Sequence, residues 1–147
     1  MKLLKMYEWI AGSMTDFIRP FKDNETLYAQ AKSFWKTLES NSFLLLLTFV
    51  VLGIAFAAYY YSAYNNKPGR HYKPAKWFLF LATAAITTFL VTLGAEYAIA
   101  QPKLLGAMML ETRIALGNAS YAAALYFIVS VIWCNALPTN ACRIFKF

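Results

Sequence analysis

Long stretches without a charged residue constrain this chain more than any other feature of its sequence. No Asp, Glu, Lys or Arg occurs in residues 40–66, 77–95 or 114–142. Because about 20 apolar residues in a helix cross the hydrocarbon core of a bilayer, each stretch is long enough for one span. We therefore expect an all-α integral membrane protein with about three transmembrane helices. Their approximate bounds are 43–64, 77–98 and 119–137.

The composition supports a membrane protein rather than a soluble one. Hydrophobic residues make up 60% of the 147 residues and charged residues 14%, whereas soluble domains have about 45–50% and about 25%. A soluble fold of this length could not hide so much apolar surface behind so few charges. A bilayer removes this difficulty because lipid solvates the outside of the helices.

Residues 1–42 precede the spans and have the pattern of two amphipathic helices. The apolar face of the first comprises Leu3, Met6, Tyr7, Ile10, Met14, Phe17 and Ile18. Pro20 ends this helix, and Asp23 or Asn24 caps the second. The apolar face of the second comprises Leu27, Tyr28, Ala31, Phe34, Trp35 and Leu38. Such helices lie in the headgroup plane, or pack against a partner subunit or the chain's own helices.

The connector between the first two spans, residues 65–76, is short, rich in turn-forming residues and strongly basic. Its basic residues and its one histidine are Lys67, Arg70, His71, Lys73 and Lys76. Its length allows only an antiparallel hairpin of the flanking helices. The basic side chains bind anionic lipid headgroups, line a lumen in an assembly, or act as ordinary positive-inside anchors. A single histidine without a neighbouring acid or cysteine makes neither a metal site nor a general base.

Charge asymmetry favours the cytoplasmic side for this connector only slightly. Lys and Arg near the ends of spans prefer the cytoplasm. Against this, residues 1–42 carry six basic groups and no signal for their export, which favours the opposite orientation. We expect a multi-pass protein of an inner or plasma membrane.

Residues 101–118 have a mixed pattern in which apolar positions lie beside Lys103, Glu111 and Arg113. Pro102 suits a helix N-terminus, and Gly117 with Asn118 suggests a stop. The segment is therefore predicted to be a short interfacial or re-entrant helix, separate from the third span.

Glu96 is the most interesting acid, because it follows nineteen uncharged residues near the end of the second span. An ionisable group at membrane depth is a candidate functional site, here by pairing with Lys103 or Arg113 or by lining an ion path. The alternative is that Glu96 only marks where the helix leaves the hydrocarbon.

The two cysteines, Cys134 and Cys142, flank Pro138. In an oxidising compartment they would bridge a short loop, and in a reducing one they would remain thiols. Small residues at helix-packing spacing, such as Gly53 with Ala57, suit close approach of helices within the chain or between copies.

The sequence lacks the residues that catalysis needs. It has no glycine-rich phosphate loop and no Cys or His cluster with metal-ligand spacing, and five of its seven carboxylates lie in residues 1–42. We therefore expect no enzyme, no cofactor, no metal, no nucleic acid and no small-molecule substrate. The expected partners are membrane lipids and other membrane protein subunits or copies of the same chain.

Three functions from different classes fit these features. The first is a non-catalytic structural subunit of a multiprotein membrane complex, as in secretion, conjugation or respiration. The second is a homo-oligomeric pore lined by threonines of the second span and Glu96. The third is a filament subunit, since residues 43–98 resemble the helical hairpin of conjugative pilins in architecture, although the third span departs from that pattern.

Overall fold

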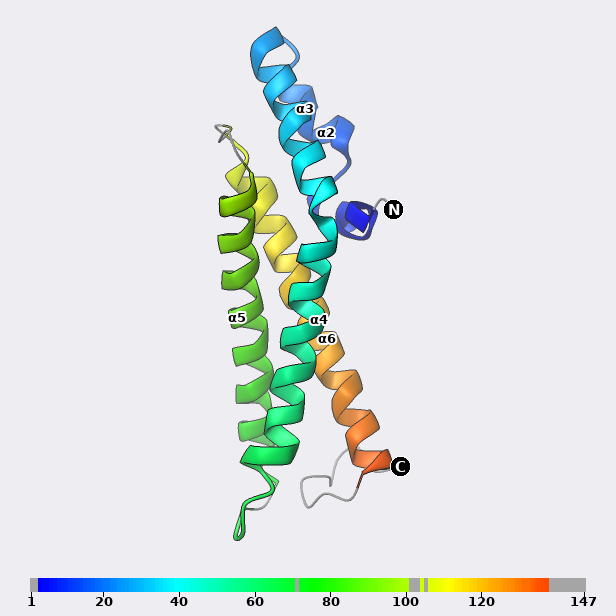
Figure 1. Ribbon diagram of the computed structural model, residues 1–147, viewed down its shortest axis with the longest axis vertical. Coiled ribbons are helices and arrows are strands. Elements are labelled where there is room, and N and C mark those ends of the chain that lie inside the picture. The colour runs from blue at the N-terminus through cyan, green and yellow to red at the C-terminus, as the bar shows by residue number, and fades with distance from the viewer. Residues whose placement is uncertain (1–2, 71, 101–103, 105, 138–147) are drawn as a thin grey trace. The chain divides into compact units, whose positions relative to one another are not determined.

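The computed structural model describes residues 3–70, 72–100, 104 and 106–137, and every regular element in these ranges is helical (Figure 1). The short N-terminal elements are η1 (Leu3–Tyr7), α1 (Glu8–Ala11), α2 (Met14–Ile18), η2 (Arg19–Phe21) and α3 (Glu25–Ser40). The later elements are α4 (Ser42–Tyr59), the π-helical turn η3 (Tyr60–Tyr64), α5 (Pro74–Ile99) and α6 (Met108–Ala136). The predicted all-α fold class is confirmed.

Three helices among the described residues are long and apolar enough to cross a membrane, which identifies a membrane protein. They are Ser42–Tyr64, formed by α4 with η3, then α5 and α6. In their most apolar stretches only 22%, 17% and 39% of the residues are buried within the chain. Most of the surface of these helices is therefore left for lipid or for partner chains.

The chain divides into two compact units, described separately below. Unit 1 comprises residues 1–48 and 89–118, and unit 2 comprises residues 49–88 and 119–147. Each of the three long helices contributes one part to each unit.

The first amphipathic segment of unit 1 is broken, where the sequence predicted one helix up to Pro20. Gly12 adopts φ +81°, which side chains with a Cβ rarely tolerate, and separates α1 from α2. Ser13 then caps α2 in a capping box, in which Ser13 and Asp16 exchange side-chain and backbone hydrogen bonds. The prediction of one helix up to Pro20 was wrong because the apolar pattern continues across Gly12, whereas the helix does not.

The second amphipathic segment forms α3 as predicted, and it packs within unit 1. The Asn24 side-chain oxygen accepts hydrogen bonds from the backbone N–H groups of Thr26 and Leu27, so Asn24 is the cap. Within the helix, Ala31, Phe34, Trp35 and Leu38 are buried. The Phe17 ring of α2 lies 6.0 Å from the Phe34 ring and 5.8 Å from the Trp35 ring. Of the alternatives for this apolar face, the structure favours packing on the chain's own helices.

Helix α6 runs without interruption through Gly117 and Asn118, so the predicted stop there is wrong, and residues 108–118 are continuous with the third span. Residues 101–103 and 105 of the predicted segment lie outside the described residues. Both residues serve packing in unit 1. A Cβ on Gly117 would lie 3.0 Å from the Tyr7 ring, so glycine permits this close approach. Asn118 is fully buried, and its polar side chain is used in a tertiary hydrogen-bond network.

The core of unit 2 is aromatic. The π-helical geometry of η3 allows the consecutive residues Tyr60 and Tyr61 both to be buried. The Tyr60 ring lies 5.2 Å from the Phe80 ring, and the Trp77 indole N–H donates to the Ser130 hydroxyl oxygen at 3.1 Å. These contacts join η3 to the first turns of α5, and α5 to α6, and form the predicted hairpin around the basic connector.

Gly53 brings α4 and α6 close together within unit 2. A Cβ at this position would lie 3.0 Å from the Ala122 carbonyl oxygen. The small residues at packing spacing are therefore used, at this point, for contact inside the chain.

Candidate functional site

A polar network lies at the centre of unit 1, on helices that are otherwise apolar. The Tyr7 hydroxyl donates to the Asn118 side-chain oxygen. The Asn118 side-chain nitrogen donates to the Leu45 carbonyl oxygen at 2.9 Å and to the Thr92 hydroxyl oxygen at 2.9 Å. One side chain thus joins the N-terminal segment, α4, α5 and α6. Sequence reasoning missed this role, although an asparagine within an uncharged run is a usable signal for an interhelical hydrogen bond.

Glu96 lies in the same unit and is completely buried, with 0% of its side chain exposed. Neither carboxyl oxygen has a hydrogen-bond partner among the described residues, and no ion pair joins it to Arg113 there. The other predicted partner, Lys103, lies outside the described residues. Glu111 is close enough to interact with Glu96 electrostatically. A buried carboxyl of this kind can exchange a proton or take a cation.

Glu96 continues a polar face of α5. Thr88, Thr92 and Glu96 recur at four-residue intervals, so they share one side of the helix, and all three have no exposed surface. The Thr88 hydroxyl donates to the Ala84 carbonyl oxygen one turn earlier at 2.8 Å. This face is turned into the chain and is not available on the surface.

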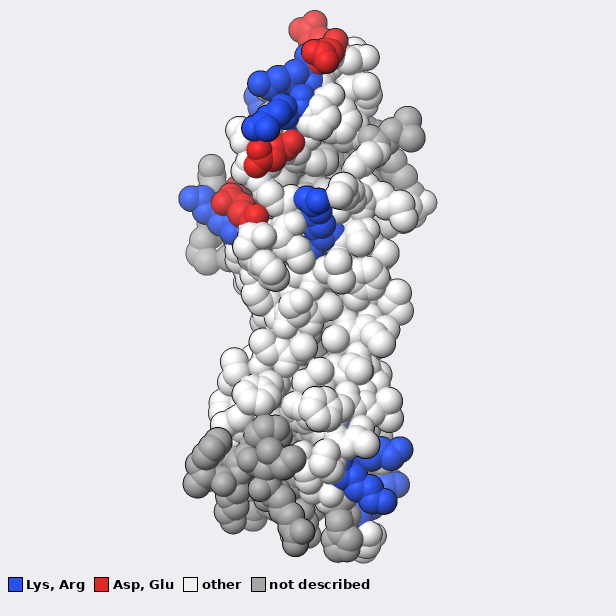
Figure 2. Space-filling view, turned by 180° about the vertical axis from the view of Figure 1, so that it is seen from behind, with Lys and Arg blue, Asp and Glu red and all other residues white. Residues whose placement is uncertain are grey.

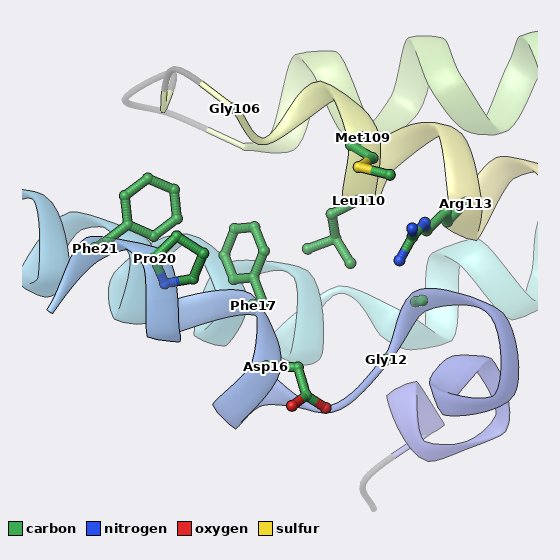
Figure 3. A pocket seen from close by; sticks show the side chains of 10 residues that line it. Gly12, Asp16, Phe17, Pro20, Phe21, Gly106, Met109, Leu110 and Arg113 are labelled. Carbon is green, nitrogen blue, oxygen red and sulfur yellow. The ribbon is translucent and has the colours of Figure 1, made fainter.

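The beginning of α6 borders two apolar cavities in unit 1. The first has a volume of about 330 Å³. It is lined by Ala11, Gly12, Asp16, Phe17, Pro20, Phe21, Gly106, Met109, Leu110 and Arg113. Figure 3 shows Phe17 and Leu110 turned toward each other across it, with Arg113 beside them and the Asp16 carboxylate turned away. Arg113 is half-buried and has neither a hydrogen bond nor an ion pair among the described residues.

The second cavity of unit 1 is larger, with a volume of about 450 Å³. It is lined by Phe34, Leu93, Tyr97, Leu104, Gly106, Ala107, Met108 and Glu111. Gly106, at φ +97°, lines both cavities. Met108 and Met109 follow it at the start of α6, and their side chains are 73% and 64% exposed. Flexible methionines beside apolar hollows form an adaptable contact surface.

The predicted basic connector belongs to unit 2. Lys67, Arg70, Lys73 and Lys76 are exposed, and His71 lies outside the described residues. Three of the four, Arg70, Lys73 and Lys76, line one cavity of about 250 Å³, and Lys67 does not. Figure 2 shows Lys and Arg gathered on this part of unit 2 without an Asp or Glu among them.

Cys134 is also in unit 2, where it is 4% exposed. Its sulfur lies 3.8 Å from the Tyr61 hydroxyl oxygen. Cys134 is disulfide-bonded and not a free thiol. Its predicted partner, Cys142, lies outside the described residues.

These places differ in what they can do chemically. The Asn118 network is fully hydrogen-bonded and structural. Glu96 is a buried acid without a hydrogen-bonding partner among the described residues. The cavities beside α6 offer apolar binding surfaces, and the cavity of the connector offers a cationic one.

No protein-family model, no curated protein and no solved structure matches this chain.

Proposed function

We propose that this chain is a non-catalytic structural subunit of a multiprotein membrane complex, of the kind used in secretion, conjugation or respiration, in an inner or plasma membrane. The observation that carries the proposal is the pair of apolar cavities at the start of α6, bordered by exposed Met108 and Met109. Exposed apolar surface next to charged groups is typical of a protein-binding site.

The partner that fits this surface is an apolar helix carrying one acidic side chain. Its apolar face would fill the cavity between Phe17 and Leu110, and its acid would pair with Arg113. A half-buried guanidinium without an acceptor is costly, so an acid from another chain would offset this cost. The charge therefore supports a protein partner over the acyl chain of a lipid.

The pore alternative has less support. A lumen needs a row of polar side chains on the outer surface of the chain. Thr88, Thr92 and Glu96 of α5 have no exposed surface. Thr83 is exposed and Thr87 is half-buried, and the Thr83 hydroxyl donates to the Leu79 carbonyl oxygen of its own helix. If copies of the chain nevertheless formed a pore, Glu96→Gln would alter ion flux in liposomes.

The test is native mass measurement after extraction of the tagged, full-length chain from its own membrane with a mild detergent. We expect a complex with unrelated chains in fixed stoichiometry. Arg113→Glu should release the chain from it, and the matched control Lys32→Glu, on the exposed side of α3, should not. A lone monomer, or release by both variants alike, would overturn the proposal. A closed ring of identical copies would favour the pore, and an open polymer the filament.

A further inference from the structure

The cavity of the basic connector in unit 2 is lined by cations and by no acid. Its lining residues are Tyr64, Asn65, Gly69, Arg70, Lys73 and Lys76. The sequence segments of unit 2, residues 49–88 and 119–147, contain no Asp or Glu at all. The positive charge at this cavity therefore has no acidic counterpart within its unit, and its counter-ions come from outside the unit.

Arg70 is held in place at the rim of this cavity. One guanidinium nitrogen donates to the Tyr64 carbonyl oxygen at 2.9 Å, and the guanidinium carbon lies 4.3 Å from the centre of the Tyr64 ring. A guanidinium has five N–H donors in a fixed plane. Because the Tyr64 contacts fix that plane, the remaining donors are oriented before any ligand arrives.

Asn65 adds an independent observation that points to a ligand. Its side chain is 3% exposed, it lines the cavity, and its amide nitrogen has no hydrogen-bond acceptor among the described residues. Buried donors are normally paired, so an unpaired one calls for an acceptor that is bound from outside. An oxyanion supplies an acceptor for the Asn65 amide and for the remaining N–H donors of Arg70, and its negative charge balances the charge of the Arg70 guanidinium.

The start of α5 lies beside the same residues. The Lys73 carbonyl oxygen accepts the first backbone hydrogen bonds of α5, from Lys76 at 3.0 Å and Trp77 at 3.2 Å. Lys73 and Lys76, both lining the cavity, thus flank the positive end of a 26-residue helix. The helix end adds to the attraction for an anion that Arg70 and Asn65 already provide.

We propose that this cavity is a specific site for a phosphate oxyanion, held by Arg70 and the Asn65 amide with Lys73 and Lys76 around it. An anionic phospholipid headgroup and free inorganic phosphate offer the same chemistry. The site goes beyond the proposed subunit role and does not depend on it. It also differs from ordinary positive-inside anchoring, in which every basic residue of the connector counts equally.

The control for this distinction is in the chain itself. Lys67 lies in the same connector, is exposed and carries the same charge, but does not line the cavity. Arg70→Gln and Lys67→Gln therefore remove one charge each, and only the first removes a group of the site. Arg70→Lys keeps the charge but loses the planar fork of donors, and Asn65→Leu removes the buried amide.

The experiment uses the full-length chain in nanodiscs and two ligand sources. Native mass spectrometry counts phosphatidylglycerol retained per chain from mixed phosphatidylglycerol and phosphatidylcholine discs, and inorganic phosphate is titrated calorimetrically into pure phosphatidylcholine discs. We expect tight retention in at least one arm, weakened about tenfold by Arg70→Gln and several-fold by Arg70→Lys, and nearly unchanged by Lys67→Gln. Circular dichroism verifies that each variant remains folded, and Arg70→Lys keeps the test decisive should Asn65→Leu not fold. Equal losses for Arg70→Gln and Lys67→Gln, or no retention in either arm, would overturn the proposal.

Discussion

The Asn118 side-chain nitrogen donates a hydrogen bond to the main-chain carbonyl oxygen of Leu45, 73 positions earlier in the chain, at 2.9 Å. The same nitrogen donates to the Thr92 hydroxyl, and the Asn118 side-chain oxygen accepts from Tyr7. In an apolar environment there is no water to form these hydrogen bonds in place of the protein partners. This one residue therefore connects the parts of unit 1 more specifically than apolar packing does.

Replacement of Asn118 by alanine should destabilise unit 1. The change leaves the buried hydroxyl of Thr92 without its donor and removes the acceptor of Tyr7, so we expect a loss of about 1–3 kcal/mol. Thermal unfolding of the full chain in detergent measures it. The control is Thr112→Val on the same helix, because among the described residues the Thr112 hydroxyl donates only within its own helix, to the Met108 carbonyl at 2.7 Å. Equal unfolding temperatures for the two variants would contradict the assigned role.

Gly53→Ala should weaken the contact between α4 and α6 in unit 2. The added Cβ would lie 3.0 Å from the Ala122 carbonyl oxygen and 3.3 Å from the Leu125 Cβ, so backbone has to move. We expect a loss of about 1–3 kcal/mol from this overpacking. The measurement is again the unfolding temperature in detergent, and a gain in stability would disprove the close approach.

Gly94→Ala is the matched opposite case. Gly94 lies inside α5, and a Cβ there would meet nothing within 4 Å. Alanine should stabilise the helix by roughly 0.5–1 kcal/mol, because glycine loses more conformational freedom on folding. A lower unfolding temperature in the isolated chain would refute this expectation. If the same variant weakens only the assembled complex, a partner helix packs on this side of α5.

The spans could be predicted from the sequence because the bilayer imposes a length and a charge limit that any helix must meet. The local signals failed where packing overrode them. Gly117 and Asn118 often end helices. Here Gly117 allows the Tyr7 ring to pack closely against α6, and Asn118 accepts a buried hydrogen bond from the Tyr7 hydroxyl. The apolar pattern on both sides of Gly12 predicts a continuous helix, but the backbone breaks there at φ +81°, and the capping box of Ser13 and Asp16 begins α2 directly after it.

The candidate sites were predictable only in part. The positive charge of the connector can be read from the sequence. Which of its basic residues line the cavity, as Arg70 does and Lys67 does not, depends on how the turn folds and cannot be read from the sequence. Glu96 could be singled out by its position, whereas its burial depends on how α5 packs in unit 1. The cavities beside α6 arise between segments far apart in sequence, so no local pattern encodes them.

Glu96→Gln should not destabilise the chain, and we expect a modestly higher unfolding temperature near neutral pH. Both carboxyl oxygens lack hydrogen-bond partners among the described residues, and Glu111 carries a like charge nearby. A neutral side chain of the same size removes the cost of a charge in apolar surroundings. Glu111→Gln is the comparison, since it removes the same repulsion at a half-buried position. A loss as large as that of Asn118→Ala would mean that the Glu96 carboxylate is paired.

Acidification should loosen the start of α2 through Asp16. Hydrogen bonds from the Ser13 hydroxyl and the Ser13 backbone N–H, at 2.6 and 3.3 Å, lower the pKa of Asp16 below its ordinary value of 3.8, and Arg19 adds to this. When the pKa of a carboxyl is lower in the folded chain than in the unfolded chain, it stabilises the folded chain at pH values above its ordinary pKa. This stabilisation is lost as the pH falls through the pKa of the folded chain. Stability should therefore decline below about pH 4.

The sign of this effect follows from proton binding. Below the ordinary pKa the unfolded chain takes up a proton at Asp16 before the folded chain does, so acid favours unfolding. Carboxyl carbon NMR of the Asp16 side chain in detergent measures the folded pKa directly. Asp16→Asn should remove this contribution to the acid sensitivity, whereas Asp23→Asn should leave the capping box of α2 unchanged, because Asp23 takes no part in it. A pKa for Asp16 above its ordinary value would refute the assigned hydrogen bonds, and with them the physical reason for the break at Gly12.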